Sequence, residues 1–279
     1  MMTAAEEALA RYEAEERVLT PAFVEAIPWH EARAHPLAPQ FLKTLYYMRD
    51  VEKFTALYYE QLMCTPTGRD PVISRFMTRW EKEEALHGDL LNRFLVAYGN
   101  YVLPNWDEKI FARIPRRYLW LSKITELVAR RVGESFAAVH MTWGAINEYS
   151  TLGGYARLAD LAKHPVLAHL LRGIIEEEAR HAIFYWRIAR VKIHESRRAE
   201  RLARFAIDHF WTPVGQGAKR KSDTEEVIRA LFSGEEGIAF FDRKVTGHLQ
   251  QLPGFWSCTK PTDVVRSVVD EVNDKSLSA

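Results

Sequence analysis

Apolar residues recur with a helical period along most of this 279-residue chain. This pattern predicts helices over about residues 3–26, 40–63, 72–98, 119–161 and 166–195, where the first and fourth ranges each hold one or two helices. Segments rich in Pro, Gly and Asp interrupt the pattern near residues 64–71 and 212–223, as expected of turns. Alternating polar and apolar residues, the pattern of a half-buried strand, form no convincing block. The sequence therefore predicts an all-α protein.

Four of these predicted helices carry a Glu inside their apolar stripe. A buried carboxylate is costly unless it is paired or bound to metal. On two of the helices a His follows the Glu three residues later, which places both side chains on one helix face. Two such Glu-x-x-His pairs and one Glu from each of two other helices form the dimetal site of ferritin-like bundles. Buried ion pairs are the alternative explanation of the same pattern. The predicted metal ligands are Glu52, Glu84, His87, Glu148, Glu178 and His181.

Distances along the chain from the turns support this choice of ligands. In an antiparallel helix pair, side chains at equal depth lie about equally far from the turn. Glu148 and Glu178 each stand 15 residues from Lys163. Around a turn centred near Arg69, Glu52 lies about as far before the turn as Glu84 of the first Glu-x-x-His pair lies after it. Glu60 lies closer to the turn, and at a rise of ~1.5 Å per residue this mismatch displaces it from Glu84 by roughly 9 Å along the helix axis. Glu52 is therefore preferred over Glu60.

Composition and charge fit one helical domain, residues 1–279. The expected core is a ferritin-like four-helix bundle over about residues 40–195, with further helices at 1–39 and 196–279. Hydrophobic residues make up 47% of the chain, and the net charge of +1 gives no reason to expect nucleic-acid binding. An uninterrupted apolar run long enough to span a membrane is lacking. Two cysteines and an acidic start without a signal-peptide pattern favour a cytoplasmic location.

The segment Glu83–Asn92, with the sequence EEALHGDLLN, closely resembles the first metal-ligand helix of the soluble acyl-acyl-carrier-protein desaturases. The segment from residue 146 to 185 is similar to the other ligand region of that family, including a Thr three residues after Glu148. Residues 48–52 match its first ligand helix more weakly. The resemblance covers about residues 40–195, whereas both ends of the chain match poorly.

This resemblance implies a dioxygen-dependent diiron enzyme that desaturates an acyl chain. It implies that Glu84 and Glu178 bridge the two irons, with one further Glu and one His for each ion. These ligand types suit a manganese–iron pair as well. Thr151 is the candidate catalytic residue, because it could relay a proton. Asp89 and Glu177 are the candidates for orienting the two imidazoles.

The same resemblance implies three partners: an acyl carrier protein that holds the substrate as a thioester, a ferredoxin-type electron donor, and a second copy in a homodimer. Because the carrier is acidic, we expect a basic docking face. The basic residues of the range 187–204 are the first candidates, followed by Arg116–Arg117 and Lys219–Lys221. A charged, solvated surface is the alternative interpretation of each cluster.

Three other functions remain open from the residues. A hydroxylase or N-oxygenase would use the same metals but add oxygen to its substrate. A radical-generating subunit like that of ribonucleotide reductase would carry a Tyr four residues after the first-pair His, where this chain has Leu91. Iron storage, as in ferritin, is disfavoured by the string HGDLLN. Acyl length, double-bond position and the choice between carrier protein and coenzyme A are not determined by the sequence.

Overall fold

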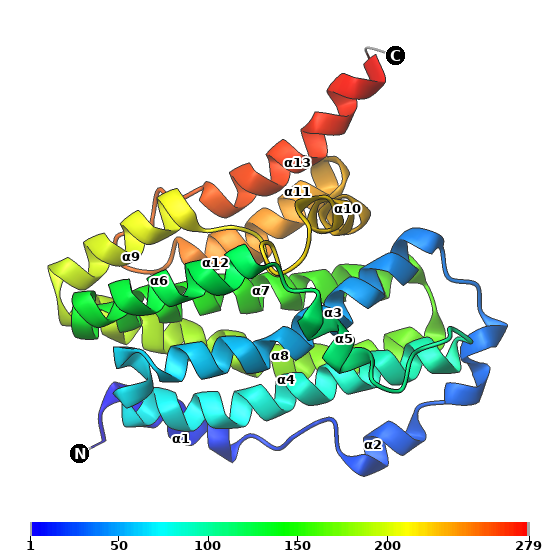
Figure 1. The fold of residues 1–279 in the computed structure, drawn as a ribbon, viewed down its shortest axis with the longest axis horizontal. Helices are drawn as coiled ribbons and strands as arrows, with labels where there is room; N and C mark the ends of the chain where they lie inside the picture. The colour runs from blue at the N-terminus through cyan, green and yellow to red at the C-terminus, as the bar shows by residue number, and fades with distance from the viewer. Residues whose placement is uncertain (1, 278–279) are drawn as a thin grey trace.

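The core of the molecule is a bundle of four long helices. The computed structural model describes residues 2–277, and those residues form helices and turns without a named strand. The bundle consists of α3 (Pro39–Met63), α4 (Pro71–Ala97), α7 (Phe136–Ala162) and α8 (Pro165–Glu195). α4 packs back along α3, α8 packs back along α7, and α4 also contacts α8 (Figure 1). The predicted all-α fold is confirmed.

The bundle helices begin where the local sequence favours a helix start. α3, α4 and α8 each begin at a Pro, whose missing N–H is not needed in the first turn. Asp70 caps α4, because its side chain accepts hydrogen bonds from the first backbone N–H groups. α7 ends at Lys163 in the left-handed conformation (φ 48°), so the chain reverses directly into α8. Both helix pairs are therefore antiparallel, as the turn counting requires.

Short helices at the N-terminal end cover one side of the bundle. They are α1 (Ala4–Ala14), α2 (Pro21–Ala26) and η1 (Trp29–Ala34). α1 packs against α4 and α8. Its start carries a reciprocal capping box between Thr3 and Glu6. This side of the bundle is thereby closed by residues that lie far away in the sequence.

The two helix pairs are connected through additional short elements. η2 (Pro66–Arg69) joins α3 to α4, and α5 (Trp106–Ala112) and α6 (Arg116–Val132) follow α4. η3 (Gly133–Ser135) then leads into α7. The range 119–161 thus contains two helices, separated at Gly133, whose φ of 75° ends α6.

The C-terminal helices pack on the side of the bundle opposite α1 (Figure 1). They are α9 (Arg197–Phe210), α10 (Lys221–Phe232), α11 (Gly234–Phe241), the π-helical η4 (Asp242–Thr246), α12 (Gly247–Leu249) and α13 (Lys260–Leu277). α9 contacts α7 and α8, whereas α10 contacts α3 and α7. Among the described residues, every helix is too short or too polar to pass through a bilayer.

Candidate metal centre

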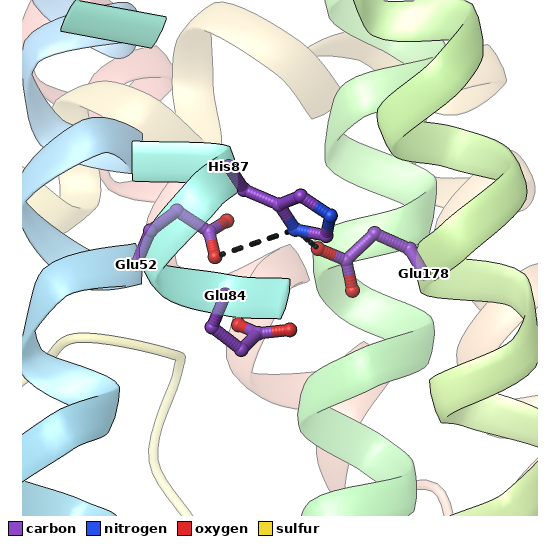
Figure 2. Close-up of side chains that lie close together, drawn as sticks. All are labelled: Glu52, Glu84, His87 and Glu178. Carbon is purple, nitrogen blue, oxygen red and sulfur yellow. Dashed lines mark hydrogen bonds and ion pairs between the residues drawn. The ribbon is translucent and has the colours of Figure 1, made fainter. Parts of the chain in front are cut away.

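Six acidic and imidazole side chains meet in the middle of the bundle. Two groups of side chains could each hold an ion, with their ligand atoms all within 4.8 Å of one another. Figure 2 shows the first group, with carboxylates from α3, α4 and α8 around one imidazole. Glu84 and Glu178 belong to both groups, as the predicted bridging ligands should. The groups are Glu52, Glu84, His87 and Glu178, and Glu84, Glu148, Glu178 and His181.

The two imidazoles point the same type of nitrogen at this centre. His87 Nδ1 lies 3.0 Å from a Glu178 oxygen and 3.9 Å from a Glu52 oxygen. His181 Nδ1 lies 2.9 Å from Glu84, 3.7 Å from Glu148 and 3.6 Å from Glu178. Both imidazoles are fully buried, so these nitrogens have no access to bulk water. A metal ion bound to each Nδ1 would take the position of a proton shared between that nitrogen and the carboxylates around it.

Unpartnered atoms test whether the site suits metal ions. Four buried ligand atoms find no hydrogen-bond partner among the described residues: Glu52 Oε2, Glu84 Oε1, Glu178 Oε2 and His181 Nδ1. Such atoms cost free energy in a protein interior unless something binds them. All four belong to the two candidate ligand groups. Carboxylate oxygens and imidazole nitrogens suit iron and manganese, so the residues fit a dimetal site.

Burial and mutual repulsion set the ionisation of the carboxylates. Burial raises the pKa of Glu84 and of Glu148 well above the usual range, and the charge of Glu178 raises both further. For Glu178 burial acts in the same direction, but the nearby imidazoles of His181 and His87 outweigh it and lower its pKa to about 2. Burial opposes the charge on His87, yet Glu177 and Glu178 raise the pKa of that imidazole to about 10. Protons therefore balance part of the negative charge that two metal ions would otherwise balance.

A second layer of acids holds the outer nitrogen of each imidazole. Glu177 lies 3.2 Å from His87 Nε2, and Glu83 lies 2.7 Å from His181 Nε2. The predicted contact of Glu177 with an imidazole is confirmed. The prediction for Asp89 is wrong, because its carboxylate is largely exposed and accepts a hydrogen bond from Lys53 instead. Both motifs read Glu-Glu-x-x-His, so the repeated first Glu could have identified Glu83.

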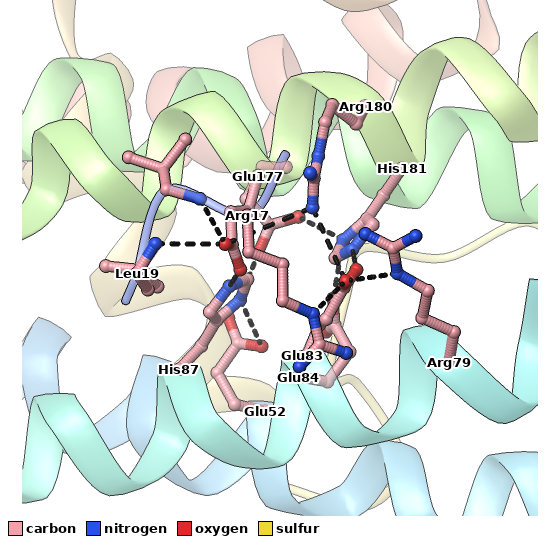
Figure 3. A network of polar contacts seen from close by, with 12 residues as sticks. Arg17, Leu19, Glu52, Arg79, Glu83, Glu84, His87, Glu177, Arg180 and His181 are labelled. Atoms are coloured by element: carbon pink, nitrogen blue, oxygen red, sulfur yellow. Dashed lines mark hydrogen bonds and ion pairs between the residues drawn. The ribbon is translucent and has the colours of Figure 1, made fainter. Parts of the chain in front are cut away.

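The N-terminal segment fixes this second layer (Figure 3). Tyr12 donates a hydrogen bond to Glu83 at 2.6 Å. The backbone N–H groups of Val18 and Leu19 donate to Glu177 at 3.0 and 3.1 Å. The helical period of the sequence does not reveal these contacts, because they join residues that are more than 70 positions apart in the chain.

Three arginines surround the carboxylate of Glu83. They are Arg17, Arg79 and Arg180, with nitrogen–oxygen distances of 3.1, 2.8 and 3.4 Å. For this buried acid desolvation acts to raise the pKa, but His181, Tyr12 and Arg79 together hold the pKa far below the usual range. Glu83 therefore stays ionised and keeps one oxygen directed at His181.

An apolar cavity reaches the ligand Glu52. Its empty space is about 610 Å³, a figure that includes space open to solvent. Thr151 lines it beside Glu52, as do side chains of α3, α7, α10, α11 and α13. Gly154 keeps its α7 wall open, since a Cβ there would lie 3.1 Å from the Met48 methyl group. The exposed Glu60 is not part of the ligand cluster, which agrees with the turn counting.

Comparison with known proteins agrees with this geometry. One similar protein is the chloroplastic palmitoyl-acyl-carrier-protein 4-desaturase of Coriandrum sativum, with 26% identity over 211 residues. The match covers 74% of this chain and 48% of the relative, so the chain spans about half of that protein's length. A model of the fatty acid desaturase family matches residues 56–202, which is more than half of the chain. The chain therefore belongs to the fatty acid desaturase family.

Proposed function

We propose that this protein is a diiron enzyme that introduces a double bond into an acyl chain held as a thioester on an acyl carrier protein. The observation that carries the proposal is the pair of overlapping ligand groups sharing Glu84 and Glu178, with an apolar cavity at Glu52. Two iron ions bound there would supply the activation of dioxygen that removal of two hydrogens from an unactivated chain requires. A manganese–iron pair would fit the same ligands.

The protein side chains have distinct tasks in this proposal. Glu52 and Glu148 each serve one ion, whereas the imidazoles supply one nitrogen each. Glu83 and Glu177 keep those imidazoles in a single orientation. To Thr151, which lines the cavity together with Glu52, we assign the transfer of a proton between the cavity and the ligand cluster.

The cavity selects an apolar substrate. Its wall includes Met48, Leu231 and Phe241, and an acyl chain lying there would exclude water from the side of the centre at Glu52. Membership of the fatty acid desaturase family and the name of the similar Coriandrum sativum protein support a carrier-bound substrate. A separate donor of the ferredoxin type would deliver the two electrons that each dioxygen needs. We also propose that the functional form is a homodimer in the cytoplasm.

Docking of an acidic carrier needs basic side chains that are free to bind it. Within the range 187–204, Lys192 pairs with Asp70 and Glu195, and Arg204 pairs with Asp208. The range is therefore not one free basic face. Among the described residues of this range, Arg190 on α8 is exposed without an acidic partner but lies over the Trp186 ring. The other exposed arginines without an acidic partner are three near the start of α9, Arg197, Arg198 and Arg201. We assign the carrier contact to these three.

Product mass tests the function directly. The iron-loaded protein would be incubated with palmitoyl-acyl carrier protein, dioxygen, ferredoxin and a reductant, and the released acyl chain weighed. Loss of two hydrogens supports desaturation. Gain of one oxygen would instead identify a hydroxylase, which uses the same ligands. Anomalous scattering at the iron and manganese edges identifies the two ions independently of turnover.

A further inference from the structure

α6 presents a large apolar face to solvent. Its most exposed apolar side chains are Trp120, Leu121, Leu127 and Val128, with 63, 53, 66 and 51% of their surface accessible. Ala129 is the only buried residue among the 17 of this helix. Contacts with α3 and η3 attach α6 to the outside of the bundle. An apolar face of this kind, formed by neighbouring turns of one helix, marks an interaction surface rather than scattered exposure.

Basic residues accompany this apolar face. α6 carries Arg116, Arg117, Lys123, Arg130 and Arg131 against a single acid, Glu126. Glu126 pairs with Arg130, so its charge is already used within the helix. At 100° per residue along a helix, Arg117 and Arg131 lie on the same face of α6 as its exposed apolar side chains, and Lys123 lies at the edge of that face. A partner that covers this face of α6 therefore has to offer an apolar region and negative charge close enough together for one helix to contact both.

We propose that α6 is a membrane-surface helix that seats the protein on an anionic lipid bilayer. Helices that lie in the plane of a bilayer combine Trp and aliphatic side chains, which enter the acyl region, with Lys and Arg, which contact anionic headgroups. A second copy of this chain fits less well. Two α6 helices facing each other through this face would bring Arg117, Lys123 and Arg131 of both copies together with no acidic residue on the face. An acidic carrier protein would match the charge but not the apolar surface.

The position of α6 connects such a surface to the apolar cavity. Tyr118, in the first turn of α6, packs against the loop that follows α9. A Cβ at Gly217 in that loop would lie 3.2 Å from the Tyr118 ring. The same loop supplies Pro213 and Val214 to the cavity wall. A bilayer in contact with α6 would thus lie beside one wall of the cavity at Glu52. Membrane seating is a property of the chain that does not depend on the proposed reaction.

Vesicle binding tests the proposal without turnover. The metal-loaded protein would be floated with vesicles of phosphatidylcholine containing phosphatidylglycerol, and with vesicles of phosphatidylcholine alone. We expect binding to the anionic vesicles that weakens as salt is raised. Trp120→Glu with Leu127→Glu should reduce binding roughly 100-fold, at about tenfold for each apolar side chain withdrawn from the lipid. Trp256→Glu is the matched control, because Trp256 is also highly exposed but lies between α12 and α13.

A second variant separates charge from apolar contact. Lys123→Glu with Arg131→Glu should weaken binding to anionic vesicles and make the remaining binding less dependent on salt, although Arg116, Arg117 and Arg130 remain. Circular dichroism and metal content should stay unchanged in both variants, since the replaced side chains lie on the surface. Failure of the parent protein to bind anionic vesicles would overturn the proposal, as would equal binding by the Trp120 and Leu127 variant. A dimer or a carrier complex that needs Trp120, without vesicle binding, would assign the face to that partner instead.

Discussion

Tyr155 donates a hydrogen bond to Glu52, the carboxylate that α3 contributes to the candidate metal centre. Both side chains are buried, and the bond joins α7 to α3 across the bundle. It uses the Oε1 atom of Glu52 and leaves Oε2 without a partner. The phenol thereby holds the Oε1 atom, and in the proposed centre Oε2 would be the oxygen that binds a metal ion.

Tyr155→Phe should weaken the ion held by Glu52 and His87. The variant keeps the ring but removes the donor, so Glu52 can rotate. Loss of an outer hydrogen bond to a metal ligand typically lowers affinity ~10–100-fold. Titration of the metal-free protein with Fe²⁺ under anaerobic conditions measures the change. Tyr185→Phe is the control, because the Tyr185 hydroxyl donates to the sulfur of Met77 rather than to a ligand. Equal losses in the two variants would contradict the assigned role of Tyr155.

Glu84→Ala should lose both ions and all turnover. Glu84 belongs to both ligand groups, so its removal leaves each ion one ligand short. Fold stability can change in either direction, because removing a buried charge also relieves its desolvation cost. Metal content per chain is therefore the measurement, and Glu60→Ala at an exposed position of α3 is the control. Two ions per chain in Glu84→Ala would exclude a bridging role.

Metal affinity should rise with pH. His87 in the metal-free site has a pKa of about 10, and the pKa values of Glu84 and Glu148 are raised as well. These groups bind protons near neutral pH, and a metal ion must displace them to reach the same atoms. A higher pH removes the competing protons and so favours the ion. Calorimetric titrations at about pH 6 and about pH 8 in buffers of different ionisation enthalpy count the released protons. Affinity that is independent of pH would contradict this ionisation.

The sequence predicts well which acidic and imidazole side chains meet inside the bundle, because its signals are local. Helical period and the i, i+3 spacing place each Glu and His, and the distances to the turns select Glu52 over Glu60. Glu83 and Tyr12 escape such reasoning, because their contact depends on how α1 lies across the bundle. Asp89 was assigned wrongly because helix period does not show that Lys53 lies within reach. Part of the cavity wall comes from α10, α11 and α13, which lie outside the part of the chain that resembles the family.

Gly154→Leu should shift activity towards shorter acyl chains. Gly154 faces the cavity between Met48 and Leu231, where a Cβ would lie 3.1 and 3.6 Å from their side-chain ends. A leucine there would occupy space that the proposed function assigns to the substrate. Its helical backbone accepts the change, because its φ is not in the left-handed range. Competition between acyl substrates of different length measures the shift. Gly153→Ala is the control, since Gly153 faces Phe240 and does not line the cavity.

Reversing Arg197, Arg198 and Arg201 to Glu should weaken use of a carrier-bound substrate and leave metal content unchanged. Charged residues at the edge of an interface mainly speed up association of the partners. The decrease should therefore appear in kcat/KM, and it should become smaller as salt screens the charges. An acyl-coenzyme A substrate should show a smaller effect, because its phosphates are also anionic but fewer contacts are available. Arg172→Glu, at an exposed position on α8, is the control for a changed surface charge. Unchanged kcat/KM with acyl carrier protein at low ionic strength would show that these arginines form only a solvated surface.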